Sequence, residues 1–208
     1  MNLQQIFKNN QSWVKEKLSL DEHYFEKLAK GQDPDIMYIG CSDSRVAAED
    51  LMGVEPGDVF VYRNIANMVP NTDVSALSAI AYAIKHLKVD HIIVCGHYHC
   101  GGVKAAMETN DLGILNSWLR GIRDVYRFHK DELMPITDEE EKYKRLVELN
   151  VREQCINVIK TSSFQRESKI RKVHVHGWIF DIETGTLTDL QIDFDSVMKS
   201  LKDIYRIG

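Results

Sequence analysis

The fold is indicated most clearly by residues 91–102, His91-Ile92-Ile93-Val94-Cys95-Gly96-His97-Tyr98-His99-Cys100-Gly101-Gly102. Its apolar first half predicts a short buried strand, because a short apolar run that ends at a glycine is typical of one. The second half places an imidazole and a thiol, those of His97 and Cys100, on the loop that leaves this strand. Both groups are zinc ligands, but this spacing alone is only moderately specific for a metal site.

A third candidate ligand lies far upstream. Cys41 follows another strand-like run, residues 35–40, and opens the polar segment Cys41-Ser42-Asp43-Ser44-Arg45. Ligands of parallel sheets bind beyond the carboxyl ends of the strands, and both segments lie at such ends. Two cysteines and one histidine supply three of the four ligands of a tetrahedral zinc and leave one position for water. The sequence therefore predicts a catalytic zinc held by Cys41, His97 and Cys100.

Strand-like and helical patterns alternate along the chain. This alternation predicts an α/β fold with a mainly parallel central β-sheet flanked by helices. Residues 2–30 have the pattern of two helices, so we interpret residues 1–208 as one domain with an N-terminal helical arm, residues 1–31, that packs on a partner subunit. The predicted strands are 35–40, 59–62, 91–95, 173–180 and 187–194, and the later helices are 73–87, 112–129 and 139–161.

Composition narrows the class of protein. The 208 residues are 44% hydrophobic and 27% charged, as in ordinary globular proteins, and the net charge of −5 argues against a nucleic-acid partner. The sequence has no uncharged apolar stretch long enough for a membrane span and no signal-peptide pattern, so we expect a cytoplasmic protein. In a reducing cytoplasm, metal binding is a better interpretation of cysteines than disulfides. We interpret Cys95 and Cys155 as buried apolar side chains.

Asp43 and Arg45 give the open zinc position a purpose. A zinc with two thiolates has little residual positive charge, so it acidifies its water weakly. An ionised carboxylate beside that water can accept its hydrogen and orient it. The guanidinium of Arg45 can keep the Asp43 carboxylate ionised through two parallel hydrogen bonds. Away from a metal, the same two residues would be an ordinary surface ion pair.

These motifs identify a family resemblance. Cys41-Ser42-Asp43-Ser44-Arg45 and His97-Tyr98-His99-Cys100-Gly101-Gly102 together resemble the β-class carbonic anhydrases of bacterial type. The likeness continues through Glu55-Pro56-Gly57-Asp58, Arg63-Asn64-Ile65-Ala66-Asn67 and His176-Gly177-Trp178, and so covers nearly the whole chain.

The resemblance implies a lyase that reversibly hydrates carbon dioxide to bicarbonate and a proton. It implies one Zn²⁺ per chain on Cys41, His97 and Cys100, with attack on CO₂ by a zinc-bound hydroxide. Asp43 and Arg45 would be the catalytic pair that orients the hydroxide. It also implies a homodimer with exchanged N-terminal helices, or a homotetramer.

The same resemblance carries over a substrate pocket. Gln32, Phe60 and Tyr82 match residues that line the family's pocket, the last two often from a neighbouring subunit. Without the resemblance, Phe60 and Tyr82 would be interpreted as core. Gly101 and Gly102 allow close backbone approach and then begin a helix, whose free N–H groups suit an anionic product.

Two features depart from the family pattern. A non-catalytic bicarbonate site of some bacterial members uses Trp, Arg and Tyr, and the matching residues here are Tyr38, Arg63 and Phe180. Only the arginine agrees, so we expect weak or absent bicarbonate inhibition. His99 replaces a residue that is usually small; an imidazole there could relay protons, and the alternative is a solvent-facing loop histidine.

Other interpretations remain open at the level of sequence. Hydrolases of carbon disulfide or carbonyl sulfide resemble this family in fold and ligands, and motifs at the metal do not separate them. A non-catalytic, zinc-containing bicarbonate-sensing domain is the third possibility, and the intact Asp43–Arg45 pair argues against it. His174 and His176 alternate along one strand, and we interpret them as polar strand residues rather than ligands.

Overall fold

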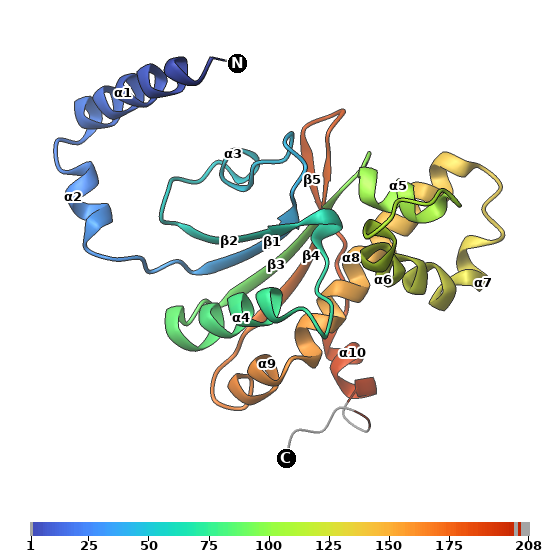
Figure 1. Cartoon of the computed structure of the whole chain (residues 1–208). Coiled ribbons are helices and arrows are strands. Elements are labelled where there is room, and N and C mark those ends of the chain that lie inside the picture. The colour runs from blue at the N-terminus through green and yellow to red at the C-terminus, as the bar shows by residue number, and fades with distance from the viewer. Residues whose placement is uncertain (1, 202–203, 205–208) are drawn as a thin grey trace. The chain divides into compact units, whose positions relative to one another are not determined.

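Two helices make up the first of two compact units, Met1–Asp33 and Pro34–Gly208, in the computed structural model, which describes residues 2–201 and 204. α1 runs over Leu3–Leu20 and α2 over Tyr24–Ala29 (Figure 1). The side chain of Asn2 caps α1 by accepting a hydrogen bond from the Gln4 backbone N–H at 3.0 Å. None of the residues of α1 is buried, and its apolar side chains include Leu3 and Phe7, each 72% exposed. The predicted arm is therefore helical, with an uncovered apolar face.

A five-stranded sheet forms the centre of the second unit, in the order β2-β1-β3-β4-β5 (Figure 1). The first four strands are parallel and β5 is antiparallel to β4, which confirms the mainly parallel sheet. Because β1 and β3 are neighbours, their carboxyl ends lie side by side. The strands are β1 Ile36–Cys41, β2 Val59–Asn64, β3 His91–His97, β4 His174–Asp181 and β5 Thr186–Asp189.

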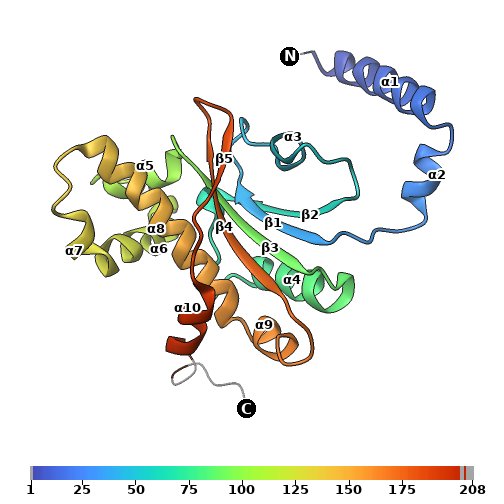
Figure 2. The ribbon, with the colours of Figure 1, turned by 180° about the vertical axis from the view of Figure 1, so that it is seen from behind.

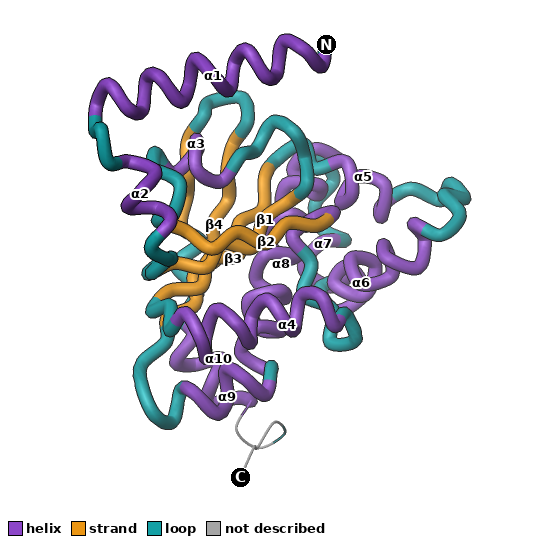
Figure 3. The backbone as a smooth tube through the Cα atoms, turned by 60° about the vertical axis from the view of Figure 1, so that its left-hand side comes forward, coloured by secondary structure: helices purple, strands orange, loops and turns teal. Residues whose placement is uncertain are grey.

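Helices cover the two faces of this sheet unequally (Figure 3). Alternate strand residues such as Ile92 and Val94 enter the main core with α4, α8 and α9, whereas Tyr38 and Ile93 pack with Ala48 of α3 on the other face. α5, α6 and α7 pack around α8 (Figure 2). The helices are α3 Ala48–Met52, α4 Val74–Tyr82 with a π-helical turn over Ala83–Leu87, α5 Gly101–Met107, α6 Leu115–Phe128, α7 Lys130–Leu133, α8 Glu139–Lys160 and α9 Ser162–Glu167.

Membrane crossing is not supported by any helix within residues 2–201. None of them combines the length and the hydropathy that a span requires.

The longest described helix, α8, is capped by Asp138, whose carboxylate accepts hydrogen bonds from the backbone N–H groups of Glu140 and Glu141 at 2.9 Å each. The acidic run at this position therefore begins a helix.

The fifth strand is shorter than the sequence pattern predicts. β5 ends at Asp189, and the expectation that it runs to Phe194 is wrong. The Asp189 carboxylate accepts the Gln191 backbone N–H at 2.8 Å, and Gln191 has a φ of +48°, so the chain turns away from the sheet. Phe194 then begins α10, Phe194–Leu201.

Candidate metal centre

Two neighbouring strands and one helix bring the three predicted ligand residues together. Cys41 is the last residue of β1, and His97 is the last residue of β3. Cys100 is the residue at the N-cap of α5, three positions after the end of β3. The parallel pairing of β1 and β3 therefore joins parts of the chain that are 59 residues apart in sequence.

The geometry of these residues suits a tetrahedral metal ion. Their ligand atoms, two Sγ and one imidazole nitrogen, all lie within 4.8 Å of one another, and within the described ranges this is the only such group. The two sulfurs are 4.0 Å apart. Two thiolates on one tetrahedral zinc, each at about 2.3 Å, would be separated by roughly 3.8 Å. All three residues are buried, with exposures of 6% for Cys41 and 1% each for His97 and Cys100.

His97 presents an unused nitrogen to this group. Its Nδ1 lies 2.9 Å from the carbonyl oxygen of Tyr98, so Nδ1–H is the donor and Nε2 carries the lone pair. Nε2 is buried and has no hydrogen-bond partner in the structure. An orphaned buried nitrogen is costly unless something binds it. A backbone-oriented imidazole with a free nitrogen is the usual form of a histidine that binds a metal.

The two thiols are coupled to each other. The two thiols lie within hydrogen-bond distance of each other, and this contact lowers the pKa of Cys41 and raises the pKa of Cys100. Cys41 also accepts the backbone N–H of Ala66 at 3.4 Å. The contact therefore favours a single negative charge on the pair, and a cation between the sulfurs would favour loss of the second proton. This donor set fits a divalent metal that binds thiolates.

Asp43 and Arg45 form the predicted pair beside the ligands. Arg45 Nε and a terminal guanidinium nitrogen donate to the two Asp43 oxygens at 2.9 and 2.7 Å. These bonds hold the pKa of Asp43 well below its usual range. Asp43 Oδ2 lies 3.9 Å from His97 Nε2, so the ionised carboxylate borders the ligand cluster. Arg45 also donates to the backbone carbonyl of His99 at 3.2 Å.

Arg63 forms hydrogen bonds to the backbone that the sequence did not indicate. Its guanidinium donates to the carbonyl oxygens of Cys41 at 2.8 Å and of Asp43 at 2.6 Å. Arg63 therefore holds the loop that carries both the Cys41 thiol and the Asp43 carboxylate. Tyr38 is 1% exposed and lies in the smaller core, against which Phe180 packs.

The predicted pocket residues are only partly gathered within the second unit. The rings of Phe60 and Tyr82 lie 5.7 Å apart between centroids. Phe60 pairs with Met37, four residues before Cys41 on β1, so both rings lie away from the ligand end. Gln32 belongs to the first unit and is exposed.

The two glycines at the start of α5 differ. A methyl group at Gly102 would lie 2.7 Å from Ile65 Cγ2 and 3.2 Å from Ala66 Cβ. Nothing lies within 4 Å of the corresponding position at Gly101. Gly102 thus allows close contact with a neighbouring turn, whereas Gly101 borders open space.

The side chain of His99 lies against Glu183. Its Nε2 lies 3.1 Å from the carboxylate of Glu183, and the side chain is 37% exposed. Its backbone has a φ of +61°, which places the carbonyl within reach of Arg45. A cavity of about 470 Å³ adjoins this loop and is lined by His99, Lys104, Met107, Glu108, Glu139, Glu140 and Tyr143.

Sequence reasoning missed Tyr143, which supports the ligand loop. Its hydroxyl donates to the carbonyl oxygen of Cys100 at 3.1 Å, and only 6% of the residue is exposed. Tyr143 lies on the buried side of α8. A tyrosine within an apolar helical stripe is a signal that its hydroxyl has a buried partner.

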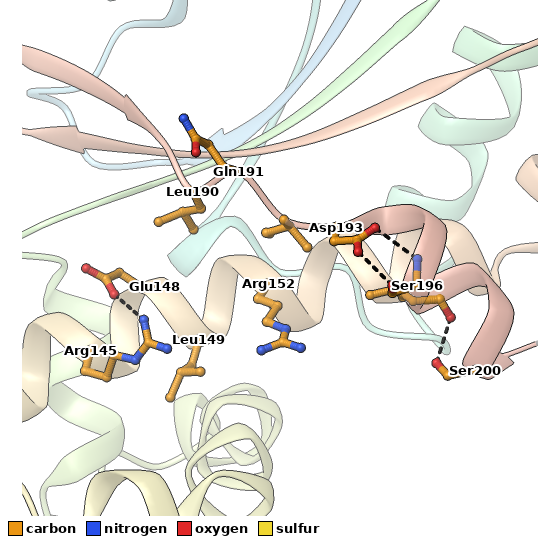
Figure 4. Close-up of a pocket in the computed structure, with 11 residues that line it drawn as sticks. Arg145, Glu148, Leu149, Arg152, Leu190, Gln191, Asp193, Ser196 and Ser200 are labelled. Atoms are coloured by element: carbon orange, nitrogen blue, oxygen red, sulfur yellow. Dashed lines mark hydrogen bonds and ion pairs between the residues drawn. The ribbon is translucent and has the colours of Figure 1, made fainter.

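A separate groove of about 440 Å³ lies between α8 and the segment 190–200 (Figure 4). Arg145 donates to Glu148 at 2.6 Å within it, and Ser196 donates to Asp193 at 2.7 Å. None of the predicted site residues lines this groove. The residues predicted to bind the metal are therefore grouped elsewhere, at the ends of β1 and β3.

The structure is an α/β fold with a cysteine–histidine cluster that could hold a metal ion. Comparison with known proteins gives its family. The family model described as carbonic anhydrase matches residues 36–187. A carbonic anhydrase of Emericella nidulans is 54% identical over 97% of this chain and 89% of its own length. A Candida albicans carbonic anhydrase is 36% identical over 93% and 69% of the two chains.

Solved structures agree with this family. The β-carbonic anhydrase CafA of Aspergillus fumigatus superposes with a TM-score of 0.92 at 35% identity, with 99% of both chains covered. One of two tetrameric β-carbonic anhydrases from Sordaria macrospora gives a TM-score of 0.87 at 40% identity, over 91% of this chain and 96% of that one. The chain belongs to the β-carbonic anhydrase family and is an enzyme of that class. The resemblance found in the motifs is confirmed.

Proposed function

We propose that this enzyme reversibly hydrates carbon dioxide to bicarbonate and a proton at a zinc ion held by Cys41, His97 and Cys100. The observation that carries the proposal is the buried, unpartnered Nε2 of His97, which faces two sulfurs and an ionised carboxylate. When bound, zinc supplies the Lewis acidity that makes water a nucleophile near neutral pH. Three protein ligands leave one position for that water.

The surrounding residues orient the reacting groups. The Asp43 carboxylate would be placed to accept a hydrogen from the water, because it is ionised, so both oxygens are acceptors, and one of them borders the cluster. Arg45 keeps that carboxylate ionised and fixes its direction through two hydrogen bonds. Since Asp43 stays without a proton at neutral pH, it cannot return one to the nucleophile.

We also propose roles for the expected substrate pocket. The rings of Phe60 and Tyr82 would form an apolar wall for CO₂, and the Gln32 amide would hold an oxygen. Because both rings lie away from the ligand end of their own chain, the proposal places them at the site of a neighbouring subunit. The backbone N–H groups at the start of α5, at Gly101 and Gly102, would receive the anionic product.

The proposed assembly is a homodimer or homotetramer in the cytoplasm. The exposed apolar face of α1 supports an arm, residues 1–31, that packs on a partner subunit of the single-domain chain. The Sordaria relative is described as tetrameric. All four cysteines are buried and free, as is common in a reducing compartment.

We propose that bicarbonate, the product, does not inhibit the enzyme by binding at Arg63. The guanidinium of Arg63 already donates to the carbonyl oxygens of Cys41 and Asp43. Phe180 adds no hydroxyl donor. Activity that rises sigmoidally with pH, together with bicarbonate bound near Arg63, would contradict this proposal.

The decisive experiment measures zinc content and stopped-flow CO₂ hydration across pH on the same preparation. We expect one zinc per chain and activity that increases with pH. H₂S release from CS₂, measured in parallel, distinguishes the related hydrolase activity. One zinc per chain with no hydration at alkaline pH would instead indicate a sensing domain.

A further inference from the structure

We infer that Asn150 and Gln154 of α8 are positioning residues for the metal centre. They hold a turn, Ile65–Asn67, in the conformation that directs the backbone N–H of Ala66 at the sulfur of Cys41. The inference rests on the proposed zinc site. It extends the site to two side chains that contact neither the ligands nor the substrate.

The turn has an unusual backbone. Ala66 has φ +62° and ψ +34°, and Asn67 has φ +49°, so two successive residues occupy the left-handed region. An alanine enters this region at a cost, because its Cβ crowds the following carbonyl. Such a conformation persists only where the surroundings impose it. Here it turns the Ala66 N–H towards Cys41 Sγ, at 3.4 Å.

Two buried amides impose this conformation from α8. Asn150 Nδ2 donates to the carbonyl oxygen of Ala66 at 3.1 Å, and Gln154 Oε1 accepts the backbone N–H of Val69 at 2.8 Å. Gln154 Nε2 in turn donates to Asn150 Oδ1 at 3.1 Å, which fixes the two amides to each other. Both residues are 1% exposed. Amides are rarely buried so fully in a helix unless their hydrogen bonds are needed.

Contacts on the other sides complete the enclosure. Asn64 accepts the backbone N–H of Met68 and donates to its carbonyl, at 2.7 Å each. Trp118 Nε1 donates to the Ile65 carbonyl at 2.9 Å. Gly102 leaves no room for a Cβ beside Ile65 and Ala66. Residues of β2, α5 and α6 therefore contact the turn or the residue that follows it, and the two amides of α8 connect this segment to the longest helix.

The chemical consequence concerns the donor strength of Cys41. An N–H bonded to a thiolate withdraws electron density from the sulfur and fixes the direction of its lone pairs. In a site with two thiolates, this leaves the cation more positive charge than it would otherwise keep. Asn150 and Gln154 act on that balance only through the peptide of Ala66.

The test compares Asn150→Ala with the wild-type holoenzyme and with Cys155→Ala. Cys155 lies on the same helix, is fully buried, and contacts β4 rather than the turn. Zinc release is followed with a chromophoric chelator, and the thiolate charge-transfer band is recorded after replacement by Co²⁺. We expect Asn150→Ala to release zinc about 10–100-fold faster and to shift the band, since changes behind a ligand act on this scale. Cys155→Ala should change neither.

A double variant tests the role of the turn itself. Glycine adopts the left-handed conformation without help, so Ala66→Gly in the Asn150→Ala background should slow zinc release and return the band towards its wild-type position. If Asn150→Ala does not fold, Gln154→Glu is used in its place. This substitution removes the Nε2 donor to Asn150 at nearly constant side-chain size.

The outcomes separate this inference from the proposed function. Wild-type release and spectrum in Asn150→Ala, an equal change in Cys155→Ala, or no recovery in the double variant would each overturn it, while zinc and hydration in the wild type would still support the proposed function. A wild-type protein that binds no zinc would overturn both.

Discussion

The two ends of β3 each carry a group of histidines or cysteines, and they differ in what is left unpaired. At the first residue of β3, His91 Nδ1 lies 3.0 Å from His176 Nε2, and His174 stacks on His91 with ring centroids 5.1 Å apart. At the last residue, His97 Nε2 has no partner and faces two sulfurs. Two imidazoles of the first group bond each other, whereas the second group leaves a buried imidazole nitrogen without a hydrogen-bond partner.

The difference shows why clustering alone does not identify a metal site. Three imidazoles share one face at the start of β3 and β4, as the alternation of strand residues requires. Burial and mutual repulsion lower the pKa values of His174 and His176. The hydrogen bond between His91 and His176 occupies one ring nitrogen of each. The cluster at His97 has the features that distinguish a ligand set: two cysteine sulfurs, an oriented imidazole and a free lone pair.

The largest effect is expected from Cys41→Ser. Removal of one thiolate should abolish stoichiometric zinc binding, and CO₂ hydration should fall by more than the roughly 100-fold typical of changes behind a ligand. Zinc analysis and stopped-flow hydration measure both. Cys95→Ala, a buried cysteine of β3 that is not a ligand, is the matched control and should retain its zinc. Full zinc occupancy in Cys41→Ser would refute the assignment.

A smaller loss is expected from Asp43→Asn. The amide presents an N–H where the carboxylate offers only acceptors, so hydration should fall by about 100-fold while zinc remains bound. The control is Asp50→Asn, an exposed carboxylate of α3. Undiminished turnover in Asp43→Asn would show that the pair does not orient the nucleophile.

A substitution in the histidine group at the start of β3 and β4 should affect stability rather than activity. Since the pKa of His176 is lowered from 6.5 on folding, the unfolded chain binds more protons, and the free energy of unfolding decreases as the pH falls below about 6.5. His176→Gln should weaken this decrease, as measured by urea unfolding at pH 7.5, 6.5 and 5.5. Zinc content and hydration at pH 7.5 should be unchanged.

The control for this variant is His23→Gln, whose imidazole is 59% exposed. It should keep the wild-type dependence on pH. If the free energy of unfolding depends on pH identically in His176→Gln and in the wild type, then His176 does not contribute to the acid sensitivity of the fold.

The smallest effect is expected from His99→Ala. Its side chain faces Glu183, and the substitution keeps the backbone carbonyl that Arg45 uses. Turnover in dilute buffer should stay within about twofold of wild type, far from the roughly 100-fold that loss of a proton-transfer group costs. A large decrease that added imidazole buffer restores would establish His99 as a proton relay.

The ligands and the Asp43–Arg45 pair could be predicted because each lies in a short segment at the end of a strand. Local patterns carry that information: an apolar run, a glycine, and then polar or thiol side chains. The supports could not be found in this way. Asn150 bonds Ala66 across 84 residues, and Gln154 bonds Val69 across 85. The predicted end of β5 was wrong for a local reason. The alternation of polar and apolar residues continues beyond Asp189, although the chain turns there.

The joining of β1 and β3 at the cluster has a consequence for assembly. A zinc held by Cys41 and Cys100 closes a loop of 59 residues, much as a disulfide would, and restricts the unfolded chain in the same entropic sense. The loop is defined only after the two strands have paired. Metal loading should therefore follow sheet formation, and the bound ion should lock the carboxyl edge of the sheet after the topology is complete.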